Sequence, residues 1–167
     1  MMIFNQDLVK SRKASSIDNI KNSDFYRFLY SDLIQRLEPI DKTYKEGLVL
    51  GFGNYHMFPI NNPYNLNYTE LDQLVLIEKK SLDLVLFPFG FHWLNDVQKF
   101  LFKVKEVLKN DGIFVCNFAG SGSLNHLRKL LFLAEEEHNI SHFPHISPFI
   151  KFEDMTPLMQ QAGLLKI

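Results

Sequence analysis

The sequence predicts an α/β protein built around a mainly parallel sheet. Three near-continuous apolar runs, at residues 47–52, 82–89 and 113–118, are typical of strands that are buried on both faces. Segments in which apolar residues recur at helical spacing separate these runs, so strands and helices alternate along the chain. With 167 residues, the chain is expected to form a single domain.

The first half of the chain offers fewer clear elements than the second. Residues 1–22 are polar and weakly patterned, and Ser23-Asp24 is expected to cap a helix that ends at Pro39. Residues 54–69 are rich in Asn, Pro and Tyr and predict an irregular loop. The short apolar run at 74–77 could form a further strand.

The second half predicts three helices and the remaining turns. Asn95 is expected to cap a helix whose apolar stripe runs from Val97 to Leu108, and a turn at 110–112 follows it. A helix is expected to start at Ser123, with one apolar face formed by Leu124, Leu127, Leu131 and Ala134.

The C-terminal segment predicts one more helix and a strand. The helix is expected over about 152–162, and Gly163 suits a left-handed cap at its end. Residues 164–167 could open a final strand.

Composition narrows the class of protein. The formal net charge of −1 gives no basic field for nucleic acid, and the single cysteine, Cys116, fits a reducing cytosol. The N-terminus carries no apolar secretory core, and the longest apolar stretch, 84–94, is too short to span a bilayer. These features predict a soluble cytoplasmic protein with no nucleic-acid partner.

Several stretches together resemble one superfamily. The segment SLDLVLFPFGFHWLND (81–96) is similar to the fourth strand of a class I S-adenosylmethionine (SAM) methyltransferase, and LKNDGIFVCNF (108–118) to its fifth strand. The order HW-x-ND, LK-x-DG, L-x-x-LR, AE-x-E, PHISPF and AG resembles the branch of the methyltransferase-like assembly factor of mitochondrial respiratory complex I and its alphaproteobacterial relatives. FLYSDLIQRL (28–37) resembles the helix before that branch's first strand, and the biotin-pathway carboxyl methyltransferase is a more distant cousin.

The resemblance implies a Rossmann-like domain that binds SAM. It divides the chain into an N-terminal helical segment, 1–45, and an incomplete methyltransferase-like core, 46–167. About one strand-helix unit after Gly53 and the C-terminal strand pair are expected to be missing. The activity implied is methyl transfer or, as associated with the complex I factor, arginine hydroxylation; the fold does not choose between them.

The first cofactor motif is expected in GLVLGFGNY (47–55). An acidic residue and three glycines at alternate positions would stand where this chain has Val49, Gly51, Gly53 and Tyr55. Gly51, Phe52 and Gly53 therefore match the cofactor loop, whereas the acid and the third glycine are replaced. Losing the acid removes a polar contact worth about 1–3 kcal/mol. A Gly-x-Gly pair by itself is more often only a tight turn.

Other cofactor contacts are assigned by the same resemblance. Asp72 best matches an acidic position at which relatives contact the adenine, Glu70 is its competitor, and either could be a solvated loop acid. No acid for the ribose hydroxyls can be assigned. Phe87 and Pro88 would lie beside the methionine part of the cofactor, or could serve core packing.

Histidines supply the remaining candidate groups. His92 could act as a general base or orient the substrate, or be a structural histidine bonded to the backbone. His138, His142 and His145 match no standard zinc spacing, so no metal is expected. The resemblance places PHISPF (144–149) near the substrate mouth, and Glu135 to Glu137 predict a solvated helix face.

Two functions remain open at this point. The family resemblance favours a SAM-dependent enzyme, whereas the altered motifs favour a catalytically impaired relative that serves as a protein-binding or assembly module. The sequence alone also leaves a third possibility, an eroding gene product. An uncovered sheet edge would favour a homodimer or a helper protein. The altered motifs predict that SAM affinity is weak or absent. A structural check is whether Tyr55 and Phe87 fill the groove beyond Gly51 and Gly53.

Overall fold

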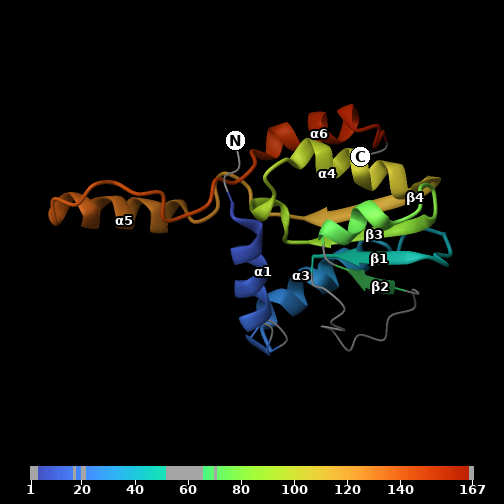
Figure 1. Ribbon diagram of the computed structural model, residues 1–167, viewed down its shortest axis with the longest axis horizontal. Helices are drawn as coiled ribbons and strands as arrows, with labels where there is room; N and C mark the ends of the chain where they lie inside the picture. The colour runs from blue at the N-terminus through green and yellow to red at the C-terminus, as the bar shows by residue number, and fades with distance from the viewer. Residues whose placement is uncertain (1–3, 17, 20–21, 52–65, 70, 166–167) are drawn as a thin grey trace.

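The computed structural model describes residues 4–16, 18–19, 22–51, 66–69 and 71–165. These residues form a four-stranded sheet with helices on both faces, and one helical arm that projects away from this body (Figure 1). Within these ranges, no helix is both long enough and apolar enough to cross a membrane.

Four parallel strands make the sheet in the order β2-β1-β3-β4. They are β1 (Gly47–Leu50), β2 (Leu66–Thr69), β3 (Leu82–Pro88) and β4 (Leu108–Asn117). Every residue of β1 and β3 is buried, which is the pattern that parallel strands covered on both faces require. The predicted α/β class with a parallel sheet is confirmed.

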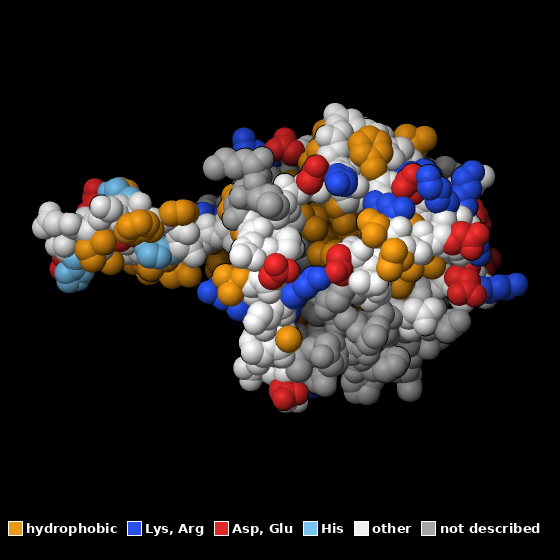
Figure 2. All heavy atoms as spheres, viewed as in Figure 1, with side chains coloured by type: hydrophobic (Ala, Val, Ile, Leu, Met, Phe, Trp, Pro, Cys, Tyr) orange, Lys and Arg blue, Asp and Glu red, His pale blue; other side chains and the backbone are white. Residues whose placement is uncertain are grey.

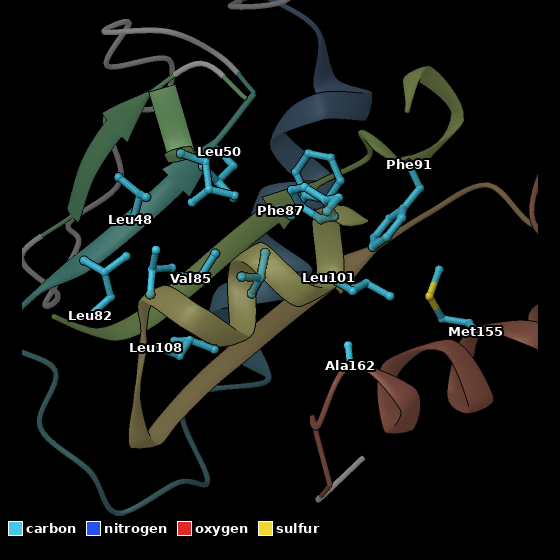
Figure 3. Packing of buried hydrophobic residues seen from close by; sticks show 14 residues of the cluster. Leu48, Leu50, Leu82, Val85, Phe87, Phe91, Leu101, Leu108, Met155 and Ala162 are labelled. Atoms are coloured by element: carbon cyan, nitrogen blue, oxygen red, sulfur yellow. The ribbon is translucent and has the colours of Figure 1, made fainter. Parts of the chain in front are cut away.

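Alternate residues of β3 enter two separate cores. Leu84 and Leu86 pack with Tyr30 and Ile34 of α3 (Asp24–Gln35) on one face. On the other face, side chains including Val85 and Phe87 pack under α4 (Val97–Val107) and α6 (Phe152–Gln161), as Figure 3 shows. Because side chains alternate across a strand, one apolar run supplies both cores.

The two remaining helices lie outside these cores. Helix α1 (Gln6–Ser15) buries no residue, and α5 (Asn125–Glu137) forms the arm with the chain that returns from it. The expected apolar face of α5 is present, but Leu124 and Leu127 are 53% and 44% exposed. Glu135 is the residue of α5 that is buried.

The N-terminal half differs from the prediction at three places. Helix α1 forms in the segment that was predicted to be weakly patterned, because its polar residues give no apolar stripe that would reveal it. Strand β2 lies within the predicted loop 54–69, and the predicted strand at 74–77 is wrong because a 3₁₀ helix, η1 (Leu71–Leu76), occupies it. Pairing with β1 outweighs the local composition of β2, and packing on α4 outweighs the local composition of η1.

Three further boundaries differ in the C-terminal half. Asp96, not Asn95, caps α4 by accepting a hydrogen bond from the amide of Lys99. The predicted turn at 110–112 is wrong, because β4 already starts at Leu108 and absorbs these residues through a register shift against β3. Gly163 follows α6 at φ +85°, as predicted, and no strand forms at residues 164–165.

Replacing Phe87 by alanine should be strongly destabilising. Phe87 is fully buried between β3, η2 (Phe91–Trp93) and α4, so the change leaves a cavity and should lower the free energy of unfolding by about 3–5 kcal/mol. Urea denaturation measures this. Phe28→Ala, at a position 68% exposed on α3, is the matched control and should cost less than about 0.5 kcal/mol. Equal losses for both variants would contradict the position of Phe87 in the core.

Candidate functional site

Gly51 follows β1 at the C-terminal edge of the sheet and leaves it at φ +96°. Side chains rarely adopt this backbone conformation, so glycine is required here. A Cβ atom at Gly51 would lie 3.5 Å from the Phe87 ring and 4.0 Å from the Lys13 ammonium, so it would point into the crevice between them. The missing side chain therefore leaves a cradle at the position predicted for the cofactor loop.

Phe87 forms the floor of this region and does not fill it. Its ring turns into the core, where it contacts the rings of Phe91 and Phe100 at centroid distances of 4.9 and 4.6 Å. Above it, a cavity of about 540 Å³ remains open. Phe87 therefore does not fill the groove beyond Gly51 and takes the core-packing role that the sequence left open. Phe52, Gly53 and Tyr55 lie outside the described residues.

This first cavity lies between α1 and the ends of β1 and β3. Its walls are mainly aromatic and apolar, and two cationic residues of α1, Arg12 and Lys13, also line it. Lys13 Nζ donates a hydrogen bond to the carbonyl oxygen of Gly51 at 3.2 Å. Within the described lining no carboxylate is present, so the cavity offers more for an anionic group than for a cationic one.

A second cavity of about 590 Å³ lies on the other side of α1. Figure 2 shows a hollow with an apolar floor beside this helix. Val9 and Lys13 line both cavities, so α1 separates them. Asp72 lines the second cavity and pairs with Lys10, and the hydrogen bond from Lys10 lowers the pKa of this carboxyl group. Glu70, the alternative to Asp72, lies outside the described residues.

Phe89 separates the first cavity from a third one. It adopts φ +46°, a strained conformation for a residue with a side chain. Asn117 at the end of β4 holds it there: the Phe89 amide donates to both the backbone carbonyl and the side-chain oxygen of Asn117, at 3.1 and 3.0 Å. The Asn117 side chain in turn donates to the carbonyl oxygen of Leu29 at 2.8 Å.

The third cavity, of about 690 Å³, has a largely aromatic lining. No Lys, Arg, Asp or Glu is part of its described lining, and its polar groups are imidazoles and hydroxyls. These residues come from α3, from the loops after β3 and β4, and from the chain that returns from the arm. They include Phe25, Phe89, His92, Phe118, Ser123, His145 and Phe149.

His92 is a neutral side chain in this setting. Burial, with a smaller contribution from the positive charge of Lys13, lowers its pKa from 6.5 to about 4. Its ring contacts those of Phe89 and Phe149 at centroid distances of 5.0 and 5.9 Å. Within the described part of the chain, its Nδ1 atom is buried without a hydrogen-bond partner. Such an orphaned atom is costly and is typical of a functional position.

One buried carboxylate holds the returning chain of the arm against α5. Glu135 is 8% exposed and accepts hydrogen bonds from His145 Nε2 at 2.7 Å, from the Phe143 amide at 3.1 Å and from His142 Nδ1 at 3.2 Å. Burial acts to raise the pKa of Glu135, but these hydrogen bonds outweigh it, so the pKa is lowered. The prediction of a solvated face is wrong for Glu135.

Arg128 fastens the next part of the returning chain. It donates hydrogen bonds to the carbonyl oxygens of Ile146 and Ser147, at 3.4 and 2.8 Å, and lies 5.3 Å from the ring centroid of Phe149. The PHISPF segment therefore forms a wall of the third cavity through Phe149 and its neighbours. No group of three potential metal ligands forms within the described residues.

The structure brings most of the predicted site residues to one edge of the sheet. Gly51, Phe87 and Pro88 line the first cavity, Asp72 the second and His92 the third. Sequence reasoning missed the contributions of α1, Phe89, Asn117 and Glu135. The N-terminal basic residues and the Glu135 triplet were visible signals, but only the fold shows what they contact.

Comparison with protein families and curated proteins gives the following relatives. Residues 60–116 match the family model described as a methyltransferase domain. The Rickettsia prowazekii protein RP459, named as a candidate methyltransferase, is 44% identical over 96 residues, which are 58% of this chain and 42% of that protein. The mitochondrial arginine-hydroxylase NDUFAF5 of Danio rerio is 37% identical over 92 residues, which are 55% of this chain and 29% of that protein. The chain thus spans less than half the length of these relatives.

Solved structures show the same fold at low sequence identity. A SAM-dependent methyltransferase from Thermotoga maritima superposes with a TM-score of 0.56 at 17% identity, covering 91% of this chain and 78% of that one. A Haemonchus contortus phosphoethanolamine N-methyltransferase bound to S-adenosylhomocysteine (SAH) gives 0.54 at 14% identity, covering 90% and 44%. The Rossmann-like methyltransferase fold is therefore confirmed.

The neutral state of His92 should make stability depend on pH. Because the folded pKa is about 4 and the ordinary value is 6.5, the unfolded chain binds a proton in this interval and the folded chain does not. The free energy of unfolding should therefore fall as the pH drops from about 6.5 toward about 4. His92→Gln should remove this part of the slope, as measured by urea denaturation across pH 4–8. An unchanged slope in the variant would contradict the buried, neutral assignment.

Removing the charge of Glu135 should loosen the returning chain of the arm. In Glu135→Gln, the Phe143 amide loses a charged acceptor and should exchange its hydrogen several-fold faster with solvent. Hydrogen-exchange mass spectrometry over residues 141–147 measures this. Glu136→Gln removes the same charge from an exposed neighbour and should leave the exchange unchanged. Acidification should mimic Glu135→Gln only once the pH falls below the lowered pKa of this carboxyl group, because the carboxylate accepts these hydrogen bonds as a charged group only above that pKa.

Proposed function

We propose, on the premise that this chain is related to the class I SAM-dependent methyltransferases and to their complex I assembly branch, that it binds SAM at the C-terminal edge of its sheet. The cofactor would lie in the first and second cavities, and the group acted upon in the third. The observation that carries the proposal is the open cradle at Gly51, which leads into a cavity that shares the wall residue Phe89 with an aromatic cavity.

The residues present fit such a cofactor at most of its parts. The crevice at Gly51 admits a ligand close to the backbone, and Arg12 lines the same cavity as a cation for a carboxylate end. Asp72 would meet the adenosine end from the second cavity. The family's acidic residue is replaced by Val49, which is 1% exposed in the core and cannot offer a polar contact. This loss supports the expectation of weakened binding.

The chemistry that SAM supplies when bound is a transferable methyl group. The chain's own contribution is an acceptor cavity with a desolvating aromatic lining and a neutral imidazole, His92, which can accept a hydrogen bond from a substrate group. Two reactions suit this site: methyl transfer, and arginine hydroxylation of the kind for which the mitochondrial relatives are named. We include in this proposal a cytoplasmic location, which the composition predicts, and a role in the assembly of respiratory complex I, which the sequence resemblance implies.

A second candidate function is a protein-binding module, with or without catalysis. Its supporting observation is the arm, along which apolar side chains remain exposed on more than one face of α5. The exposed fractions are 50% for Leu130, 46% for Phe132, 47% for Leu133 and 62% for Phe143. Contiguous apolar surface of this kind is typical of protein interfaces, so we include a protein substrate, a helper protein or a second copy among the partners.

Calorimetric titration of the purified chain with SAM and SAH tests the proposed function. We expect dissociation constants between about 1 μM and 1 mM, that is, about −8 to −4 kcal/mol. Gly51→Ala should weaken binding at least about tenfold, because a Cβ fills the cradle and strains the backbone. Gly122→Ala, at an open position, is the control and should bind as the unmodified chain does. Equal affinities for both variants would place the ligand elsewhere.

A further inference from the structure

Helix α1 is attached to the site by polar contacts and not by a buried face. No residue of α1 is buried. The chain before it is held by the Asn95 side chain, which bonds the amide and the carbonyl of Phe4 at 2.8 and 2.9 Å. Gln6 also donates to the carbonyl oxygen of Trp93 at 3.0 Å. These partly buried hydrogen bonds are individually worth little, and α1 has no buried apolar face, so α1 belongs to the parts of the fold that detach most easily.

Two lysines of α1, one helical turn apart, reach into the two cavities that lie on either side of this helix. Lys10 pairs with Asp72 in the second cavity, and Lys13 donates to the Gly51 carbonyl oxygen in the first. Residues three apart lie on the same face of a helix, so both ammonium groups point toward the sheet edge from one stripe of α1. These two acceptors are the ones that the proposed function assigns to the two ends of the cofactor.

The cofactor needs the same acceptors. SAM carries an ammonium and a sulfonium, and its adenine and ribose add hydrogen-bond donors, so it must find oxygen acceptors in the groove. With Val49 buried in place of the acid, the Gly51 carbonyl is one acceptor that the described residues offer to the charged end of the cofactor. Three carboxylates line the described part of the second cavity. Asp96 caps α4 and Glu106 pairs with Lys79 and Lys103, so Asp72 is the carboxylate left to serve as an acceptor for the cofactor.

We propose that α1 is a built-in competitor of the cofactor, in which Lys10 and Lys13 occupy the acceptors that SAM requires. This inference rests on the proposed function and specifies how its site is regulated. Cofactor binding then requires α1 to give up the two contacts. A partner or modification that withdraws α1 or neutralises its lysines raises cofactor affinity. Arg12 lies between the two lysines in sequence and favours cofactor binding, because it supplies a cation for the carboxylate end of SAM.

The competition predicts opposite effects at adjacent residues of α1. Lys13→Gln removes the competing cation and should tighten SAM binding about three- to tenfold, which corresponds to one hydrogen bond of ordinary strength. Lys10→Gln should tighten binding in the same direction by releasing Asp72. Arg12→Gln removes the same charge from the same helix and should weaken binding. General loss of positive charge would instead change all three affinities alike.

Calorimetric titration of the purified 167-residue chain and these three variants with SAM and with SAH provides the test, and circular dichroism confirms that each variant is folded. Tighter SAM binding in Lys13→Gln together with weaker binding in Arg12→Gln is the expected result. Weaker or unchanged binding in Lys13→Gln would overturn the inference and leave the proposed function in place. Absence of binding to SAM and SAH in the folded wild type, in all single variants and in Lys10→Gln/Lys13→Gln would overturn both.

Discussion

The burial of β3 on both faces is the constraint from which the rest of the structure follows. Its seven residues are all buried, so helices must cover both sides of the sheet. Asp83, the one charged residue of the strand, accepts hydrogen bonds from Lys109 and from the amides of Lys45 and Glu46. The parallel neighbours β1 and β4 end at the same edge. The residues that follow these strands, Gly51, Phe89 and the anchoring Asn117, therefore meet there whatever their separation in sequence.

Strain at Phe89 links the folded core to the organisation of the cavities. A left-handed phenylalanine persists only when its surroundings hold it, and here Asn117 binds its amide while α3 receives the Asn117 side chain. The ring of Phe89 lies against those of Phe25 and His92. One residue thus separates a cavity lined by Arg12 and Lys13 from a cavity whose described lining holds no Lys, Arg, Asp or Glu, so that two chemically different ligand groups can approach each other across it.

The fold and the centre of the site were largely predictable, whereas their surroundings were not. The buried strands, α4, α6 and the cradle at Gly51 follow from apolar runs, helical periodicity and glycine placement. The position of Phe87 was predicted but its effect was not, because ring orientation depends on Phe91 and Phe100. Glu135 belongs to a triplet of like residues, and nothing local distinguishes it from Glu136. Only the return of the chain at 142–145 buries it.

The order of residues alone predicts the parallel sheet, the helices with apolar stripes and the sheet edge at which ligands are expected to bind. Periodicity reports whether each segment is buried on one face or two, and this is a local property. The tertiary structure decided which polar groups meet. Lys10 and Asp72 are 62 residues apart, and Lys13 and Gly51 are 38 apart. Pairs of this kind leave no periodic signal, because each depends on one contact between distant segments and not on a repeated preference for burial.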